Sequence, residues 1–257
     1  MRPRHVRVTR YVTPLREGGS MPAVVEADDQ GLYVLKFRGA GQGPRVLVAE
    51  WIVGQLARTL GFDVPEIVFA DLDPLLARTE GDPEIQDLIR ASGGLNLAMD
   101  YLPGAANFDP LAWTPDPALA ARIAWFDAFT SNVDRTARNP NLMLWHDRLY
   151  LIDHGAALYF HHGWDGDTGR AEAAFPLIRD HVLLPCAGDI AAADAALAAQ
   201  LDDDTLRAIV AQVPDDWLEA PDAFADAATQ RAAYAEYLIR RLRHRDAFVE
   251  EIMRARA

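Results

Sequence analysis

Lysine is almost absent from this chain of 257 residues. Lys36 is the only lysine, so 24 of the 25 Lys and Arg side chains are arginine. A composition of this kind uses arginine wherever a positive charge alone is needed. Lys36 is therefore a candidate for a role that a compact ammonium fills and a planar guanidinium does not.

Cysteine and long apolar runs are also scarce. Cys186 is the single cysteine, which excludes an internal disulfide and is typical of a reducing cytoplasm. No apolar run approaches the roughly 20 residues of a membrane span, and no apolar stretch of a secretory signal follows the basic N-terminus. We therefore expect a cytoplasmic protein without a membrane span.

Positive charge is in deficit, because the formal net charge is -13. This balance argues against direct nucleic-acid binding. The one arginine-rich segment, 240–245, is interpreted as a solvated face of a helix. Half of the residues are hydrophobic, which is enough for a globular protein with an ample core.

The pattern of apolar residues divides the chain into two unequal lobes of an α+β fold. The first lobe, 1–101, is rich in strands, and the second, 102–257, is mainly helical. In the second lobe we expect a helix at 116–129, a hairpin at 142–152 and mostly helical structure over 170–257. In the first lobe we expect a helix at 46–60 and strands at 6–12, 23–26, 32–37, 67–70 and 95–101.

Lys36 lies in one of these strands, and a candidate partner lies in the helix that follows. Alternation along the strand places Lys36 on the same face as Leu32 and Val34, where an unpaired ammonium would be costly. Glu50 is the only charged residue between Leu47 and Ala57, at the border of the apolar stripe of the helix. The two charges could form an ion pair. Alternatively, Lys36 extends to the edge of the sheet and Glu50 is solvated.

A second group of polar residues surrounds the expected hairpin. Strands on either side of a turn near Asp147 would bring Asn139 to Asn141 opposite Asp153, about 5 Å away. Asp134 lies on the loop just upstream. Carboxylate and amide oxygens suit Mg²⁺, which typically takes one or two carboxylates together with substrate phosphates. The alternative is that Asp and Asn are simply common in turns.

Together these residues resemble the motifs of protein kinases. Protein kinases combine a strand lysine, a helix glutamate, a catalytic loop with the spacing D-x-x-x-x-N, and a metal-binding D-x-G after a hairpin. This chain contains, in the same order, Lys36, Glu50, Asp134-x-x-x-x-Asn139 and Asp153-His154-Gly155.

The catalytic-loop segment resembles the HipA-like kinases in particular. Its Asn132-Val-Asp-Arg135 run leads to Asn139-Pro-Asn141, and the resemblance extends over roughly 15–160. The chain departs from the eukaryotic protein kinases because its catalytic-loop segment has no H-R-D, no A-P-E segment is present, and D-H-G replaces D-F-G. Lipid and small-molecule kinases share the remaining motifs, so the substrate class stays open.

The resemblance implies a two-lobed protein-kinase-like fold and a function. The protein would be a kinase that uses ATP and Mg²⁺ and phosphorylates a hydroxyl, most simply Ser or Thr of a protein. The catalytic residues would be Lys36, which holds the phosphates and is held by Glu50, Asp134, which orients the acceptor hydroxyl and takes its proton, and Asn139. Asn139 and Asp153 would also hold Mg²⁺. A nucleotide-binding pseudokinase with a regulatory role is an alternative.

Two glycine-rich loops could cover the phosphates. We favour the loop 17–21, with Gly18, Gly19 and Ser20, because it lies between the first two strands. The loop 39–43 is the alternative, and on it rests a competing interpretation as a Rossmann-like dinucleotide enzyme. Met99 and Tyr101 lie where a kinase hinge would contact adenine through its backbone, although the same segment could be an ordinary core strand.

Overall fold

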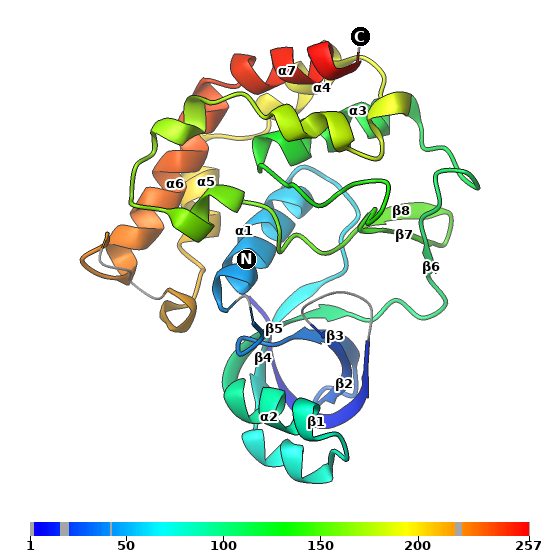
Figure 1. Cartoon of the computed structure of the whole chain (residues 1–257), viewed down its shortest axis with the longest axis vertical. Helices are drawn as coiled ribbons and strands as arrows, with labels where there is room; N and C mark the ends of the chain where they lie inside the picture. Colours follow the sequence, from blue (N-terminus) through cyan, green and yellow to red (C-terminus); the bar gives the residue numbers. More distant parts are fainter. Residues whose placement is uncertain (1–2, 16–20, 42, 219–222, 257) are drawn as a thin grey trace.

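The computed structural model of the chain describes residues 3–15, 21–41, 43–218 and 223–256. Strands form a barrel at one end of the molecule, and helices form the other end (Figure 1). Helix α1 (Arg45–Thr59) lies between the two. The expected α+β architecture with a strand-rich and a helical part is confirmed.

The barrel consists of five strands in the order β1-β2-β3-β5-β4. Neighbouring strands are antiparallel except for β1 and β4, whose parallel pairing of His5 with Phe69 closes the barrel. All five expected strands are confirmed, whereas the closure was not expected. Antiparallel pairing also excludes the alternating strand–helix order of a Rossmann-like enzyme. The bounds are β1 (His5–Pro14), β2 (Ala23–Ala27), β3 (Leu32–Lys36), β4 (Ile67–Leu72) and β5 (Gly94–Asp100).

Strand β3 separates the interior of the barrel from the side where Lys36 lies. Tyr33 and Leu35 are buried in the core cluster of the barrel. Because side chains alternate along a strand, Lys36 lies on the outer face, where its ammonium meets α1. The expected alternation is confirmed.

Helix α1 is buried on nearly every side. Of its 15 residues 11 are buried, and Glu50 is 0% exposed. Our placement of Glu50 at the border of an apolar stripe is therefore wrong. The barrel covers one side of the helix and the helical part covers the other, so the helix has no solvated face at this position.

The second part of the chain contains the expected helix and hairpin. Helix α3 (Pro117–Phe129) begins after Asp116, whose side chain accepts hydrogen bonds from the backbone N–H groups of Ala118 and Leu119. Strands β7 (Leu142–Trp145) and β8 (Arg148–Leu151) form the hairpin, and β6 (Ala106–Asn107) joins β7 as a third strand.

The remaining α-helices follow the hairpin in sequence, and together with α3 they make up the helical end of the molecule (Figure 1). They are α4 (Ile190–Ala198), α5 (Asp203–Val210), α6 (Ala227–Arg243) and α7 (Asp246–Arg256). Between β8 and α4 the chain forms only short 3₁₀ helices: η2 (Tyr159–Gly163), η3 (Gly169–Glu172), η4 (Pro176–Asp180) and η5 (Leu184–Cys186). The helical character expected from residue 170 thus becomes α-helical at residue 190.

Three smaller elements complete the fold. Helix α2 (Pro83–Ala91) and the 3₁₀ helix η1 (Pro74–Thr79) lie at the end of the barrel far from α3 (Figure 1). The 3₁₀ helix η6 (Asp215–Trp217) joins the two parts, because the indole N–H of Trp217 donates to the carbonyl of Leu95 on β5. No helix among the described residues is both long and apolar enough to cross a membrane.

Buried residues form two hydrophobic clusters. One fills the barrel, and the other joins α1 to α3 and to the four C-terminal helices. Helix α1 therefore shares its core with the second part, although it precedes residue 101 in sequence. The division into lobes at 1–101 and 102–257 stays a prediction.

The interpretation of 240–245 as a solvated face is wrong for Arg241, whereas the side chain of Arg243 is exposed. Arg241 is only 2% exposed. Its neighbours Arg240, Arg243 and Arg245 form ion pairs with acids of other elements. These arginines hold α6 and the start of α7 against the rest of the helical part.

The glycines of the loop 39–43 generate a prediction about stability. A Cβ at Gly39 would lie 2.8 Å from the backbone of Ala91, whereas a Cβ at Gly41 would have no atom within 4 Å. We expect Gly39→Ala to lower the free energy of unfolding by about 1–3 kcal/mol, because α2 must shift. The control Gly41→Ala should be neutral or stabilise by up to about 1 kcal/mol. Equal stability of the two variants in urea denaturation would contradict this packing.

Candidate active site

The ammonium of Lys36 lies between two carboxylates from distant parts of the chain. It donates to Oε1 of Glu50 on α1 and to Oδ1 of Asp153, 2.6 Å away, just after β8. Lys36 is 4% exposed. The expected ion pair with Glu50 is thus present in the structure, and Asp153 joins it as a second partner.

One cation and two carboxylates share this cluster, and the pKa values shift accordingly. Burial alone would lower the pKa of Lys36, but Glu50 and Asp153 raise it above its ordinary value. Burial raises the pKa of Glu50 to about 7, against the opposing effect of Lys36. The attraction of Lys36 lowers the pKa of Asp153. Lys36 is therefore charged at neutral pH. A second cation beside Asp153 would be stabilised by the carboxylates of the cluster.

The glycine of D-H-G permits the close approach of α1. A Cβ at Gly155 would lie 2.6 Å from Cγ1 of Val46 and 3.2 Å from Oε1 of Glu50. Asp153 itself has a φ of +53°, in the left-handed region that non-glycine residues rarely adopt. The surrounding contacts thus impose an uncommon backbone conformation that points its carboxylate at Lys36.

Asp134 is oriented by the two asparagines that follow it. Nδ2 of Asn139 donates to its Oδ2 at 2.7 Å, and Nδ2 of Asn141 donates to the same oxygen at 3.2 Å. The backbone N–H of Asp134 donates to Oδ1 of Asn132. The spacing D-x-x-x-x-N therefore brings Asp134 and Asn139 together, as the sequence predicts.

The hairpin brings this loop to Asp153. Its turn consists of His146 and Asp147, both with positive φ, which is typical of the tight two-residue turn that matches the twist of the strands. Leu142 pairs with Leu151, and the N–H of Ile152 donates to the carbonyl of Asn141 at 3.1 Å. The hairpin thus places Asn141 opposite Ile152, the residue before Asp153, and the approach of Asn139 to Asp153 stays a prediction.

Arg135 is a connecting residue that the sequence analysis missed. It is 1% exposed, and its Nε donates to Oδ2 of Asp127 on α3 at 2.5 Å. Its Nη1 donates to the carbonyl of Asn141, and its Nη2 lies 3.4 Å from Nδ1 of His154. One guanidinium thus joins the loop that carries Asp134, the start of the hairpin and the D-H-G segment.

The partner of Arg135 is held in turn by a histidine. Asp127 is fully buried, and its Oδ2 lies 2.9 Å from Nε2 of His181. Burial alone would raise the pKa of Asp127, but Arg135 and His181 lower it. Asp127 is the only acid in α3, so the reasoning that singled out Glu50 in its helix would have found Asp127 too.

The residues predicted to contact the nucleotide are placed in part. Gly18, Gly19 and Ser20 lie outside the described residues. In the alternative loop 39–43, Gly39 packs against the end of α2, which explains that glycine without a phosphate. Met99 pairs with β3 on one side and β4 on the other, and the N–H of Tyr101 donates to the carbonyl of Leu32. Backbone contact of Met99 and Tyr101 with adenine stays a prediction.

The site has few metal ligands of its own. No group of three or more His, Cys, Asp or Glu side chains suited to a metal occurs in the described part of the chain. Asp153 is nevertheless 44% exposed on its side chain, although Lys36 beside it is 5% exposed. One partly exposed carboxylate fits Mg²⁺, which binds few protein ligands when phosphates supply the others.

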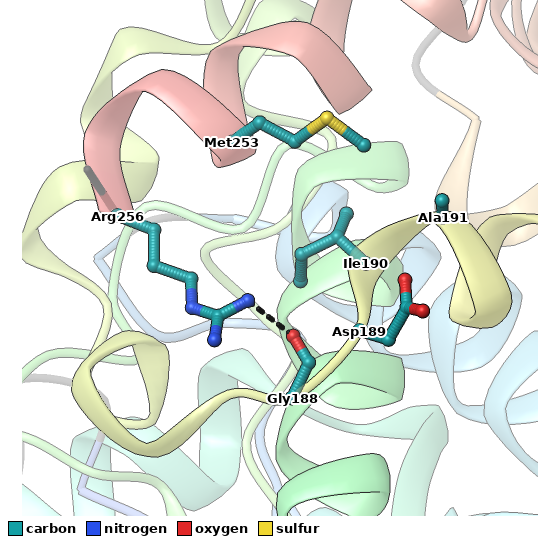
Figure 2. A pocket seen from close by; sticks show the side chains of 6 residues that line it. All are labelled: Gly188, Asp189, Ile190, Ala191, Met253 and Arg256. Atoms are coloured by element: carbon teal, nitrogen blue, oxygen red, sulfur yellow. Dashed lines mark hydrogen bonds between the residues drawn. The ribbon is translucent and has the colours of Figure 1, made fainter.

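The helical part also contains a depression that lies away from this site. It has a volume of about 670 Å³ and lies between the start of α4 and the end of α7, where Arg256 donates to the carbonyl of Gly188 (Figure 2). Its single acid, Asp189, accepts a hydrogen bond from Ala192 at the first turn of α4. None of its lining residues belongs to the cluster around Lys36.

Comparison with known proteins gives one family and several solved structures. The sequence model of the HipA-like kinase family matches residues 8–252. The crystal structure of the Helicobacter pylori proinflammatory kinase CtkA is similar to this chain with a TM-score of 0.54, at 12% identity over 96% of each chain. No curated protein sequence matches the chain.

Two crystal structures of the Golgi casein kinase are similar at lower TM-scores. One has a TM-score of 0.47 at 12% identity and covers 98% of this chain and 73% of that chain. The other, with Mn/ADP bound, has a TM-score of 0.47 at 13% identity and covers 95% of this chain and 73% of that chain.

His154 generates a prediction about acid stability. Burial, and after it the charge of Arg135, lower the pKa of His154 from 6.5 to about 3. Between those values the unfolded chain binds a proton that the folded protein does not, so the free energy of unfolding decreases as the pH falls. Between about pH 6 and pH 4 the free energy of unfolding of wild type should fall more steeply than that of His154→Phe. The difference should be up to about 1.4 kcal/mol per pH unit.

Urea denaturation at several pH values measures this difference. The control is His146→Asn, because His146 is exposed at the hairpin turn and Asn tolerates its left-handed backbone. Parallel curves for wild type and His154→Phe would contradict a neutral, buried His154.

Proposed function

The chain belongs to the HipA-like kinase family, and from that premise we propose that it phosphorylates Ser or Thr of a protein, using ATP and Mg²⁺. The observation that carries the proposal is the position of Lys36 between Glu50 and Asp153. A buried lysine paired with a helix glutamate, beside an aspartate after a hairpin, is the arrangement that phosphoryl transfer requires of a kinase.

Lys36 would bind the phosphates of ATP. Its ammonium is buried and charged, and Glu50 on the rigid helix α1 holds it in place. Phosphate oxygens carry negative charge and would replace Asp153 as the second partner of the ammonium. Asp153 would then be free for a different cation.

Asp153 and Asn139 would hold Mg²⁺. Bound there, Mg²⁺ supplies charge neutralisation on the phosphates and orients the transferred group. Asp153 is suited to this role because the charge of Lys36 lowers its pKa, so it is ionised at neutral pH. The side chain of Asn139 is exposed and hydrogen-bonded to Asp134, which links the metal position to the acceptor position.

Asp134 would orient the acceptor hydroxyl and take its proton. The side-chain amides of Asn139 and Asn141 both donate to Oδ2 of Asp134. No described residue forms a hydrogen bond with Oδ1. Oδ1 is therefore the oxygen to which a hydroxyl can donate. Asp127 on α3 is another acid of this region. It is fully buried and paired with Arg135 and His181, so it is not available to a substrate.

The assignment of the metal ligands predicts how ATP affinity depends on Mg²⁺. We expect wild type to bind ATP more tightly with Mg²⁺ than without it, and Asp153→Asn to lose this difference, because an amide replaces the charged ligand. Calorimetric titration with ATP, with and without Mg²⁺, measures both. Asp147→Asn at the hairpin turn is the matched control, since Asn tolerates its left-handed backbone. Equal affinity in all these titrations would contradict the assignment of Asp153 as a ligand of Mg²⁺.

The role of Asp134 predicts a separation of binding from transfer. Asp134→Asn should fold and bind ATP as wild type does, because Asp134 faces the acceptor and not the nucleotide. Phosphoryl transfer should fall by about 10² to 10⁴, the usual cost of losing a general base. Transfer from γ-labelled ATP and ATP affinity are measured on the same preparation. Near-normal turnover of this variant would show that another group accepts the proton.

A further inference from the structure

A second pocket lies directly beside the catalytic loop. It has a volume of about 230 Å³, which is below the roughly 300–1,000 Å³ of pockets that hold whole small ligands. Ser131 and Val133, just before Asp134, form one wall. The segment that follows D-H-G lines it as well, with the exposed side chains of Tyr159 and Leu177. Its size suits one side chain of a larger molecule.

The charge of the pocket is opposite to that of the protein. Arg170 and Arg241 line it, and no acid does, although the chain has a net charge of -13. Arg170 is exposed, and no carboxylate among the described residues pairs with it. It is thus a guanidinium without a counter-ion at the edge of the catalytic loop.

Arg241 adds a buried charge at the base of the pocket. Four of its five N–H donors bind backbone carbonyls, of Ala128, Phe129, Ala171 and Ala173. Within the described ranges no carboxylate forms an ion pair with it. Carbonyl dipoles satisfy its hydrogen bonds but do not neutralise its net charge, so both charged side chains that line the pocket are cations.

We propose that this pocket selects an acidic residue adjoining the acceptor Ser or Thr of a protein substrate. The carboxylate of a Glu or Asp would pair with Arg170, and the stem of the side chain would pack on the apolar wall around Tyr159 and Leu177. The pocket adjoins Asp134, so an occupant there lies next to the hydroxyl that Asp134 would orient. This inference rests on the proposed function and adds the substrate class.

A positional peptide library tests the proposal. Peptides with a fixed central Ser or Thr and one defined flanking residue each are phosphorylated with γ-labelled ATP and Mg²⁺ by the full-length protein. At one flanking position we expect Asp or Glu to exceed Lys or Arg by at least about fivefold. Arg170→Glu should reverse the preference at that position alone, and Arg170→Ala should abolish it.

Arg78→Glu is the matched control, because Arg78 is exposed on η1 at the far end of the barrel. It should keep the preference of wild type. Circular dichroism and thermal melting confirm that each variant folds. An acidic preference that survives in Arg170→Glu, or wild type without acidic preference, would overturn the inference.

The same experiment separates this inference from the proposed function. Asp134→Asn is assayed on the whole library beside wild type. Incorporation that depends on Asp134 but shows no acidic preference would overturn the pocket and leave the kinase assignment intact. No incorporation by wild type would overturn the protein-kinase assignment and the inference that rests on it.

Discussion

The need to pair one buried ammonium determines how the candidate active site is built. Lys36 is 4% exposed, and a lone charge at that depth would cost several kcal/mol. Its partners come from α1 and from the segment after β8, so the barrel, the central helix and the hairpin meet at one atom. If the barrel and α1 separated, Lys36 or Glu50 would remain buried without its partner, so this pair fixes their arrangement, and Asp153 attaches the hairpin to it.

A second buried cation organises the acceptor side by the same principle. Arg135 contacts Asp127 on α3, the carbonyl of Asn141 and the ring of His154. The middle residue of D-x-G is thus a histidine facing a guanidinium, where D-F-G would place an apolar ring. Lys36 and Arg135 together join the parts of the chain that would hold the nucleotide and the acceptor, since Asp153 and His154 are neighbours.

The sequence predicts the local features and misses those that depend on distant packing. The hairpin was predictable because its alternation and its turn lie within a dozen residues, and this placed Asn141 opposite Ile152, the residue before Asp153. The closure of the barrel by His5 and Phe69 joins residues far apart in sequence, so no local pattern reveals it. The depth of Glu50 depends on a helical part that covers α1 from the second side. Arg135 was missed because a loop has no periodicity that would show which of 24 arginines is buried.

The central claim is that the ammonium of Lys36 is required for phosphoryl transfer, and its most direct test is kcat/KM for ATP in Lys36→Arg. A guanidinium keeps the charge, but it is larger and planar and must displace Glu50 or Asp153. The account predicts a loss of at least about tenfold, or roughly 1.4 kcal/mol of transition-state stabilisation. Glu50→Gln should also lower the rate, and the double variant should lose less than the sum of both. Wild-type kinetics in Lys36→Arg would contradict the account.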